Sequence, residues 1–228
     1  MHLLFDLDGT LTDPAPGISR CIQHALESLG KTPPASTGLH WCIGPPLHAS
    51  FLELLKTTDH DLADRAVALY RERFSSIGLF ENEVYPGIET ALKQLTQDGH
   101  QLHLATSKPT IFATRIIDHF GLTRFFQSIN GSELDGTNAD KTDLIRHILA
   151  EQAIAPHQAI MIGDRKFDII GALENQLTAI GVLWGYGTAK ELQQAKATSL
   201  LVSPAQLYPE ITKASFPGKS SSSSCASI

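Results

Sequence analysis

Two aspartates stand close together near the amino terminus, at the end of the first apolar run of the chain. The segment is Phe5-Asp6-Leu7-Asp8-Gly9-Thr10. Two carboxylates at this spacing repel each other, so one tends to stay protonated near neutral pH unless a cation lies between them. Such a pair can divide the work of a nucleophile and of a proton carrier. The alternative is a turn in which Asp8 and Gly9 serve only the backbone.

A second acidic pair, Asp164 and Asp168, follows the apolar run from Ala159 to Ile162. Mg²⁺ prefers hard oxygen ligands and usually takes one or two carboxylates together with phosphate oxygens and waters. Asp6 and Asp164 are therefore candidate ligands of Mg²⁺. The alternative is that Asp164 or Asp168 only caps a helix that begins near Phe167.

Two further motifs carry groups that suit a phosphate. Thr106 and Ser107 follow the apolar run from Gln101 to Ala105, and a hydroxyl with free backbone N–H groups there can hold phosphoryl oxygens. Lys141 stands at the start of a predicted helix, where its charge is unfavourable to the helix dipole, which indicates another duty. A helix cap and an ordinary surface lysine are the respective alternatives.

The elements that position these residues alternate along the chain. Short apolar runs predict buried parallel strands at His2 to Leu7, Gln101 to Ala105, Ala159 to Ile162 and Thr178 to Leu183. Helical patterns lie between them, at Gly87 to Asp98, Thr110 to Phe120, Lys141 to Ala153 and from Thr188, where Thr188 and Glu191 have capping-box spacing. The fold class is therefore α/β, with a doubly wound parallel sheet whose strands end at one edge.

Residues 14–82 interrupt this alternation, because they contain helical patterns and no convincing strand. Helices are predicted from Ile18 to Leu29 and from Asp61 to Ser75, and linkers rich in Pro and Gly flank the stretch. We expect a catalytic core at residues 1–13 and 83–210, an inserted all-helical cap domain at residues 14–82, and a disordered Ser-rich tail at residues 217–228.

The overall charge and the cysteines exclude several classes of function. A formal net charge of -6 offers no broad basic surface for a nucleic-acid polymer. The first apolar run is too short for a signal-peptide core, and nothing later reaches the roughly 18 apolar residues that span a bilayer, so a cytoplasmic protein without a membrane partner is expected. The three cysteines are scattered without CxxC spacing and predict neither a disulfide framework nor a zinc site.

The motifs together resemble those of the haloacid dehalogenase-like hydrolase superfamily, in its branch with a helical cap after the first strand. Asp6-Leu7-Asp8-Gly9-Thr10 resembles the first motif, Thr106 the second, Lys141 the third and Gly163-Asp164-x-x-x-Asp168 the fourth. The four occur in family order, each at a predicted strand end or helix start, and the resemblance extends to about Leu207.

The resemblance implies a Mg²⁺-dependent phosphatase, a phosphoric monoester hydrolase, that forms a phosphorylated aspartate. Asp6 would be the nucleophile and Asp8 the acid and base, with Thr106 and Lys141 orienting the transferring group. Mg²⁺ would be held by Asp6, the Asp8 carbonyl and Asp164, with Asp168 supporting this shell from behind. Dehalogenases of the superfamily lack the second acid of the first motif, so Asp8 favours phosphate chemistry, although mutases also keep it.

The substrate is expected to be a small-molecule phosphate monoester, and the protein a monomer or homodimer. The stretch Ile43-Gly44-Pro45-Pro46-Leu47 is similar to that of a 5'-nucleotidase-like subgroup, which favours a 5'-nucleotidase-like phosphatase. The sequences of this subgroup also resemble phosphoglycolate phosphatases, so a phosphoglycolate phosphatase is the alternative function. Ser107, Arg20, Gly44 and Pro45 are candidate substrate contacts. A phosphoryl-accepting receiver-type signalling module is a more remote alternative that would need no inserted helices.

Overall fold

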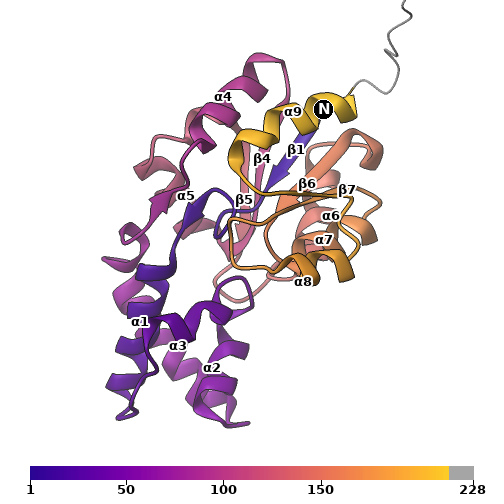
Figure 1. Ribbon diagram of the computed structural model, residues 1–228. Helices are drawn as coiled ribbons and strands as arrows, with labels where there is room; N and C mark the ends of the chain where they lie inside the picture. The colour runs from indigo at the N-terminus through magenta and orange to yellow at the C-terminus, as the bar shows by residue number, and fades with distance from the viewer. Residues whose placement is uncertain (216–228) are drawn as a thin grey trace, which may run out of the picture.

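Six parallel strands form the central sheet of the protein. The computed structural model describes residues 1–215, so the expected tail at residues 217–228 lies outside the described residues. The strand order is β5-β4-β1-β6-β7-β8, and every neighbouring pair is parallel (Figure 1). The strands are β1 (His2–Phe5), β4 (Gln101–Pro109), β5 (Phe126–Ser132), β6 (Ala159–Gly163), β7 (Thr178–Val182) and β8 (Ser199–Leu201).

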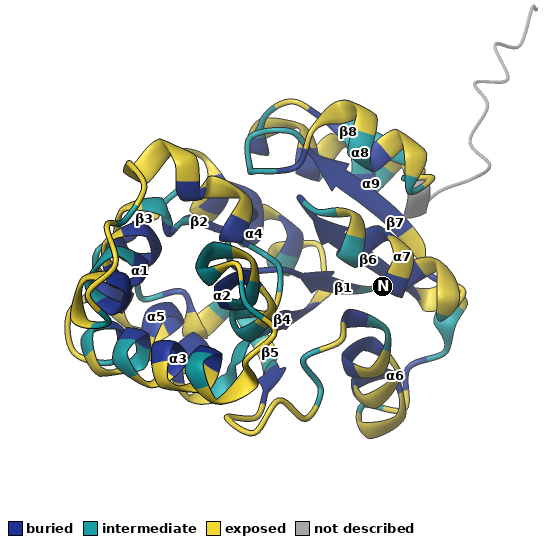
Figure 2. Cartoon of the chain, turned by 90° about the horizontal axis from the view of Figure 1, so that it is seen from below, coloured by how far each residue is buried: buried dark blue, intermediate teal, exposed yellow. Residues whose placement is uncertain are grey.

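Helices cover both faces of this sheet, as a doubly wound fold requires. Side chains alternate along a strand, so Leu3 and Phe5 of β1 face one layer and Leu4 faces the other. The first layer holds α4 (Ile88–Gln97), α5 (Thr110–His119) and α9 (Leu207–Ser215), and the second holds α6 (Lys141–Glu151), α7 (Lys166–Glu174) and α8 (Ala189–Gln194). Figure 2 shows the strands as the buried middle of this arrangement. The predicted fold class is confirmed.

The remaining helices lie between β2 (Thr12–Asp13) and β3 (Glu83–Val84), two short strands that pair antiparallel. We call residues 14–82 the helical module. Its helices are α1 (Ala15–Ser28), α2 (Leu47–Leu55) and α3 (His60–Phe74), with 3₁₀ turns η1 (Ser36–Cys42) and η2 (Gly78–Phe80). Outside it lie three further 3₁₀ turns, η3 (Thr123–Phe125), η4 (Pro156–Gln158) and η5 (Pro204–Gln206). Figure 1 shows the module beyond one end of the sheet.

The helical module shares its apolar core with the sheet. Buried Ile22 of α1 and Phe74 of α3 belong to the same continuous cluster as Phe5 of β1 and Phe112 of α5. The division into separate domains stays a prediction. No helix among residues 1–215 is long and apolar enough to cross a membrane.

Several elements differ from the sequence expectation, among them β8 and α2, which were not expected. The strand β5 was not expected, because its polar residues Ser128 and Asn130 are only partly buried at the edge of the sheet and break the apolar pattern. Pairing of Pro109 with Ser132 of β5 extends β4 past Ala105, where its apolar run ends. At α8 the Thr188 hydroxyl accepts the Glu191 N–H as predicted, whereas the Glu191 side chain turns to Arg165.

Close packing between α1 and η2 yields a stability prediction. A Cβ atom at Gly17 would lie 2.1 Å from the carbonyl oxygen of Gly78, a backbone atom that cannot yield cheaply. We expect Gly17→Ala to lower the free energy of unfolding by about 1–3 kcal/mol. Urea denaturation measures this change. In the matched control Gly38→Ala the new Cβ meets only Pro34 Cβ at 3.7 Å, so an equal loss in both variants would contradict the packing argument.

Candidate active site

The carboxyl ends of three neighbouring strands bring the motif residues to one place. Phe5 of β1 is in register with Leu104 of β4 and with Ile162 of β6. The residues that follow these three positions therefore share one edge of the sheet, and the Asp6 N–H donates to the Ile162 carbonyl at 2.9 Å. Parallel strands end together in this way, which is why open α/β folds build sites there.

Lys141 lies in the middle of this edge, and its surface-lysine alternative is wrong. The residue is 5% exposed, and its Nζ lies 2.9 Å from Asp6 Oδ1 and 2.8 Å from Asp168 Oδ1. It also donates to the carbonyl of Ala105 at 2.8 Å. Burial lowers the pKa of Lys141, but Asp168 and Asp6 raise it by more, so the ammonium stays charged. α6 can begin at this lysine because the Asp140 side chain caps the N-terminus of the helix.

Asp164 is fully buried and held by hydrogen bonds. Its Oδ2 accepts the Tyr186 N–H at 2.7 Å, and its Oδ1 lies 3.4 Å from the Thr10 hydroxyl. Gly9 follows the acidic pair with φ of +83°, and a Cβ there would lie 2.2 Å from Asp164 Oδ2. Gly9 is therefore needed both for its backbone conformation and for the close approach of Asp164.

Three buried carboxylates, those of Asp6, Asp164 and Asp168, lie together, and the Lys141 ammonium pairs with Asp6 and Asp168. One oxygen from each lies within 4.8 Å of the others. Burial raises the pKa of Asp164, and Asp168 and Asp6 add to the rise. Burial also raises the pKa of Asp168, to about 6, although Lys141 opposes the shift. Excess negative charge on clustered hard oxygen atoms is the donor set that Mg²⁺ prefers, so these residues fit the predicted ion.

Both oxygens of Asp168 already have neighbours. Oδ1 lies 2.8 Å from the Lys141 ammonium, an ion pair whose angle is not that of a hydrogen bond, and Oδ2 accepts the Arg165 N–H at 3.0 Å. The second contact also caps α7, so the capping alternative holds for Asp168 alongside its ion pair. This geometry suits the expected place of Asp168 behind the ligands rather than among them.

Asp8 is paired with a residue to which sequence reasoning gave no role. Its Oδ2 lies 2.7 Å from Lys108 Nζ, whereas its Oδ1 is buried with no hydrogen-bond partner among the described residues. Burial raises the pKa of Asp8 and Asp6 adds to the rise, against the lowering effect of Lys108. Lys108 stands two residues after Thr106, and positions two apart on a strand share a face, which is the signal that could have found it.

A cavity of about 360 Å³ lies between the helical module and the sheet edge. Asp6, Asp8, Thr106, Ser107 and Lys141 line it from the sheet side. Residues of the helical module line it from the other side: Ile18, Cys42, Gly44, Pro45, Pro46, Leu47, His48, Asp64, Val67, Tyr70, Arg71 and Phe74.

The structure brings Gly44 and Pro45 to this cavity, as predicted. The Arg165 guanidinium, paired with Glu191 at 3.0 Å, donates to the Ile43 carbonyl beside Gly44. The expected substrate contact of Arg20 needs correction. Arg20 does not line the cavity, because its guanidinium pairs with Glu81 at 2.7 Å on an exposed part of α1.

Comparison with known proteins identifies the family. The model of the family described as "Haloacid dehalogenase-like hydrolase" matches residues 3–182. The chain belongs to the haloacid dehalogenase-like hydrolase family. The predicted family and enzyme class, a phosphatase, are thus confirmed by the match and by the phosphatases among its relatives. The receiver-type alternative does not apply to a member of this hydrolase family.

Relatives of this hydrolase carry several names. The chain is similar to a 5'-nucleotidase of Pseudomonas aeruginosa, with 47% identity over 86% of this chain and 89% of that protein. It is 36% identical to the tyrosine-protein kinase PtkA of Mycobacterium tuberculosis over 86% of this chain and 66% of that protein. A phosphoglycolate phosphatase of Psychrobacter arcticus is 28% identical over 86% and 89%. The crystal structure of a predicted phosphatase from Clostridium acetobutylicum has a TM-score of 0.89 and 42% identity, covering 93% of this chain and 98% of that one.

The raised pKa of Asp168 predicts how Mg²⁺ will stabilise the protein. An acid whose pKa rises from 3.8 to about 6 on folding favours the folded state at low pH and loses that contribution as the pH passes through about 6. Above that pH the Asp168 carboxylate is ionised and adds its negative charge to the cluster until a cation binds. We expect Mg²⁺ at 100 times its Kd to add about 2.7 kcal/mol at pH 7.5 and far less at pH 5, where protons compete.

Thermal unfolding with and without Mg²⁺ at the two pH values measures this effect. Asp164→Asn should abolish the Mg²⁺-dependent rise in Tm, whereas Asp118→Asn, an exposed change on α5, should keep it. An equal rise at both pH values, or a rise that survives in Asp164→Asn, would contradict the assignment of the carboxylates.

Proposed function

We propose that this phosphatase hydrolyses a nucleoside 5'-monophosphate through an aspartyl-phosphate on Asp6, with Mg²⁺ bound at the carboxylate cluster. The observation that carries the proposal is the convergence of Asp6, Asp8 and Lys141 on one cavity edge, with Asp164 in the same carboxylate cluster as Asp6. Bound Mg²⁺ would be held by Asp6, the Asp8 carbonyl and Asp164, and it would neutralise phosphoryl charge as a Lewis acid. The expected cytoplasmic location, and a monomeric or homodimeric state, remain predictions.

Asp6 is placed to attack and Asp8 to move protons. In the first half-reaction a carboxylate oxygen of Asp6 bonds to phosphorus while the bond from phosphorus to the leaving oxygen breaks. The proton on Asp8 passes to that oxygen, and its unpartnered Oδ1 is the atom free to deliver it. In the second half-reaction Asp8 takes a proton from the water that attacks phosphorus, which releases phosphate and restores Asp6. Lys141 and Thr106 orient the transferring group throughout.

The cavity wall favours a nucleoside as the leaving group. Its module side is largely apolar and carries the stacked rings of Tyr70 and Phe74, whose centroids are 5.2 Å apart. The basic groups of the sheet side already face acids: Lys108 faces Asp8, Lys141 faces Asp6, and Arg165 faces Glu191. A neutral, flat leaving group gains apolar contact there. The carboxylate of phosphoglycolate would have to compete for a paired cation, or draw the Arg71 guanidinium away from the Leu134 carbonyl, 3.0 Å from it. The 5'-nucleotidase relative supports the same choice.

Replacing the nucleophile tests the mechanism. Asp6→Asn keeps the size of the side chain but removes the attacking carboxylate, so we expect kcat for p-nitrophenyl phosphate with Mg²⁺ to fall at least about 1,000-fold, or about 4 kcal/mol in the barrier. Unfolding curves should show that the variant is folded. Asp118→Asn is the matched control and should keep full activity. Retained turnover in Asp6→Asn would refute the aspartyl-phosphate.

The choice of leaving group is tested separately. We expect kcat/KM for nucleoside 5'-monophosphates to exceed that for 2-phosphoglycolate by at least about tenfold, which is about 1.4 kcal/mol. Phe74→Leu should reduce this preference by removing a ring face from the cavity wall, while Phe80→Leu, at an exposed ring in η2, should not. A preference for 2-phosphoglycolate would instead establish the alternative substrate.

A further inference from the structure

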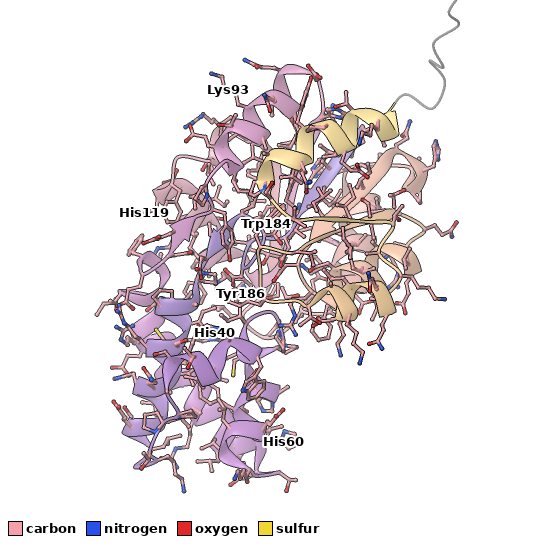
Figure 3. All side chains as sticks on the ribbon, in the orientation of Figure 1. His40, His60, Lys93, His119, Trp184 and Tyr186 are labelled. Carbon is pink, nitrogen blue, oxygen red and sulfur yellow. The ribbon has the colours of Figure 1, made fainter. Side chains whose placement is uncertain are left out.

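The loop of residues 184–187, which follows β7, lies against the proposed metal ligand Asp164. The Tyr186 N–H donates to Asp164 Oδ2 at 2.7 Å, and the Trp184 indole N–H donates to the Thr10 carbonyl at 3.0 Å. One oxygen of Asp164 is thus hydrogen-bonded to the loop, and the other, Oδ1, lies 3.4 Å from the Thr10 hydroxyl. Figure 3 shows Trp184 and Tyr186 between the sheet and the helical module.

Gly185 and Gly187 allow the loop to pack so closely against Asp164 that the loop and Asp164 must move together. A Cβ at Gly185 would lie 2.5 Å from Asp164 Cβ, and one at Gly187 would lie 1.8 Å from the Asp164 carbonyl oxygen. The loop has no side chain at either position that could separate it from Asp164. Any displacement of the loop is therefore transmitted to Asp164 by direct packing.

The side chain of Tyr186 points away from Asp164 and reaches the two linkers of the helical module, residues 12–17 and 82–87. Its hydroxyl donates to Asp13 Oδ1, the atom that also accepts the N–H of Ala15, the first residue of α1, at 3.0 Å. The hydroxyl of Tyr85, in the second linker, interacts electrostatically with that of Tyr186. The ring meets His40 of η1 edge to face, with centroids 5.7 Å apart (Figure 3).

One residue therefore contacts the metal ligand by its main chain and both linkers by its side chain. The aromatic side chain is stiff, with two rotatable bonds between its backbone and its hydroxyl-bearing ring. The module linkers cannot change their path without disturbing either this hydrogen bond or the backbone of the loop.

We propose that Tyr186 is a positioning residue that couples the orientation of Asp164 to the placement of the helical module. This inference rests on the proposed function only in taking Asp164 as a ligand of Mg²⁺. Coupling between two sites is reciprocal, so a cation that orders Asp164 must also favour the linker arrangement in which Asp13 accepts the Tyr186 hydroxyl.

Hydrogen exchange of the linkers, followed by mass spectrometry with and without saturating Mg²⁺, tests the coupling without any turnover. In the wild-type protein we expect Mg²⁺ to slow exchange in peptides that cover residues 11–17 and 82–87. In Tyr186→Phe this slowing should disappear. The N–H that supports Asp164 stays but loses its link to Asp13, so the Mg²⁺ affinity measured by calorimetry should weaken about tenfold, within the usual range of coupling between two sites. Tyr208→Phe is the matched control, because it also removes a hydroxyl bonded to an aspartate, Asp98, but on an exposed surface.

Variants of Asp13 keep the test decisive if Tyr186→Phe folds poorly. Asp13→Asn retains an oxygen acceptor and should preserve the Mg²⁺-dependent slowing, whereas Asp13→Ala should lose it. The proposal is overturned if Mg²⁺ leaves linker exchange unchanged in the wild-type protein, or if Tyr186→Phe and Asp13→Ala respond as the wild type does. Turnover of p-nitrophenyl phosphate separates the two proposals. If Mg²⁺ slows exchange in the linkers but the protein shows no turnover, the proposed function is refuted and the coupling through Tyr186 stands.

Discussion

An ammonium group buried among three carboxylates is the interaction on which the rest of the site depends. Lys141 contacts Asp6 and Asp168, while Asp164 completes a cluster that carries more negative than positive charge. Charges removed from water need partners, because the protein interior screens them poorly. The cluster is therefore incomplete with lysine alone, and a hard divalent cation would satisfy it. The same poor screening makes Asp6 and Asp8 chemically distinct groups within one short motif.

Two ordinary features of the fold bring the residues of this cluster together. Parallel register places the residues after Phe5 and Ile162 side by side, and the cap of α6 delivers Lys141 to the same edge. The helical module then closes the space above the carboxylates, where Phe74 places its ring 4.6 Å from the ammonium of Lys108. Exclusion of water strengthens each ion pair in the cavity. The module thus supports the electrostatics of the site as well as the shape of the cavity.

Two contacts that join the sheet edge to the module and its first linker are made by residues that also serve the carboxylates. Arg165 reaches the Ile43 carbonyl with its side chain while its N–H supports Asp168, and Tyr186 reaches Asp13 while its N–H supports Asp164. Because each of these residues contacts both parts, a change in the position of the module would also change the orientation of the acidic side chains. This arrangement explains why the loop that follows Trp184 contains glycines on both sides of Tyr186.

The sequence by itself determined the fold class, the strands of the sheet centre and the acidic motifs, because apolar periodicity and residue type are local properties. The same local pattern could not reveal β5, whose half-polar edge position is decided by pairing with β4. It also left Lys141 open as a surface residue and offered Arg20 as a substrate contact. Only tertiary structure decided that Lys141 is buried, that Glu81 holds Arg20, and that Lys108 faces Asp8. Each of these three results depends on charged groups that lie far apart in the sequence. The partner of a charged side chain is set by the packing of distant elements, and not by its neighbours in the chain.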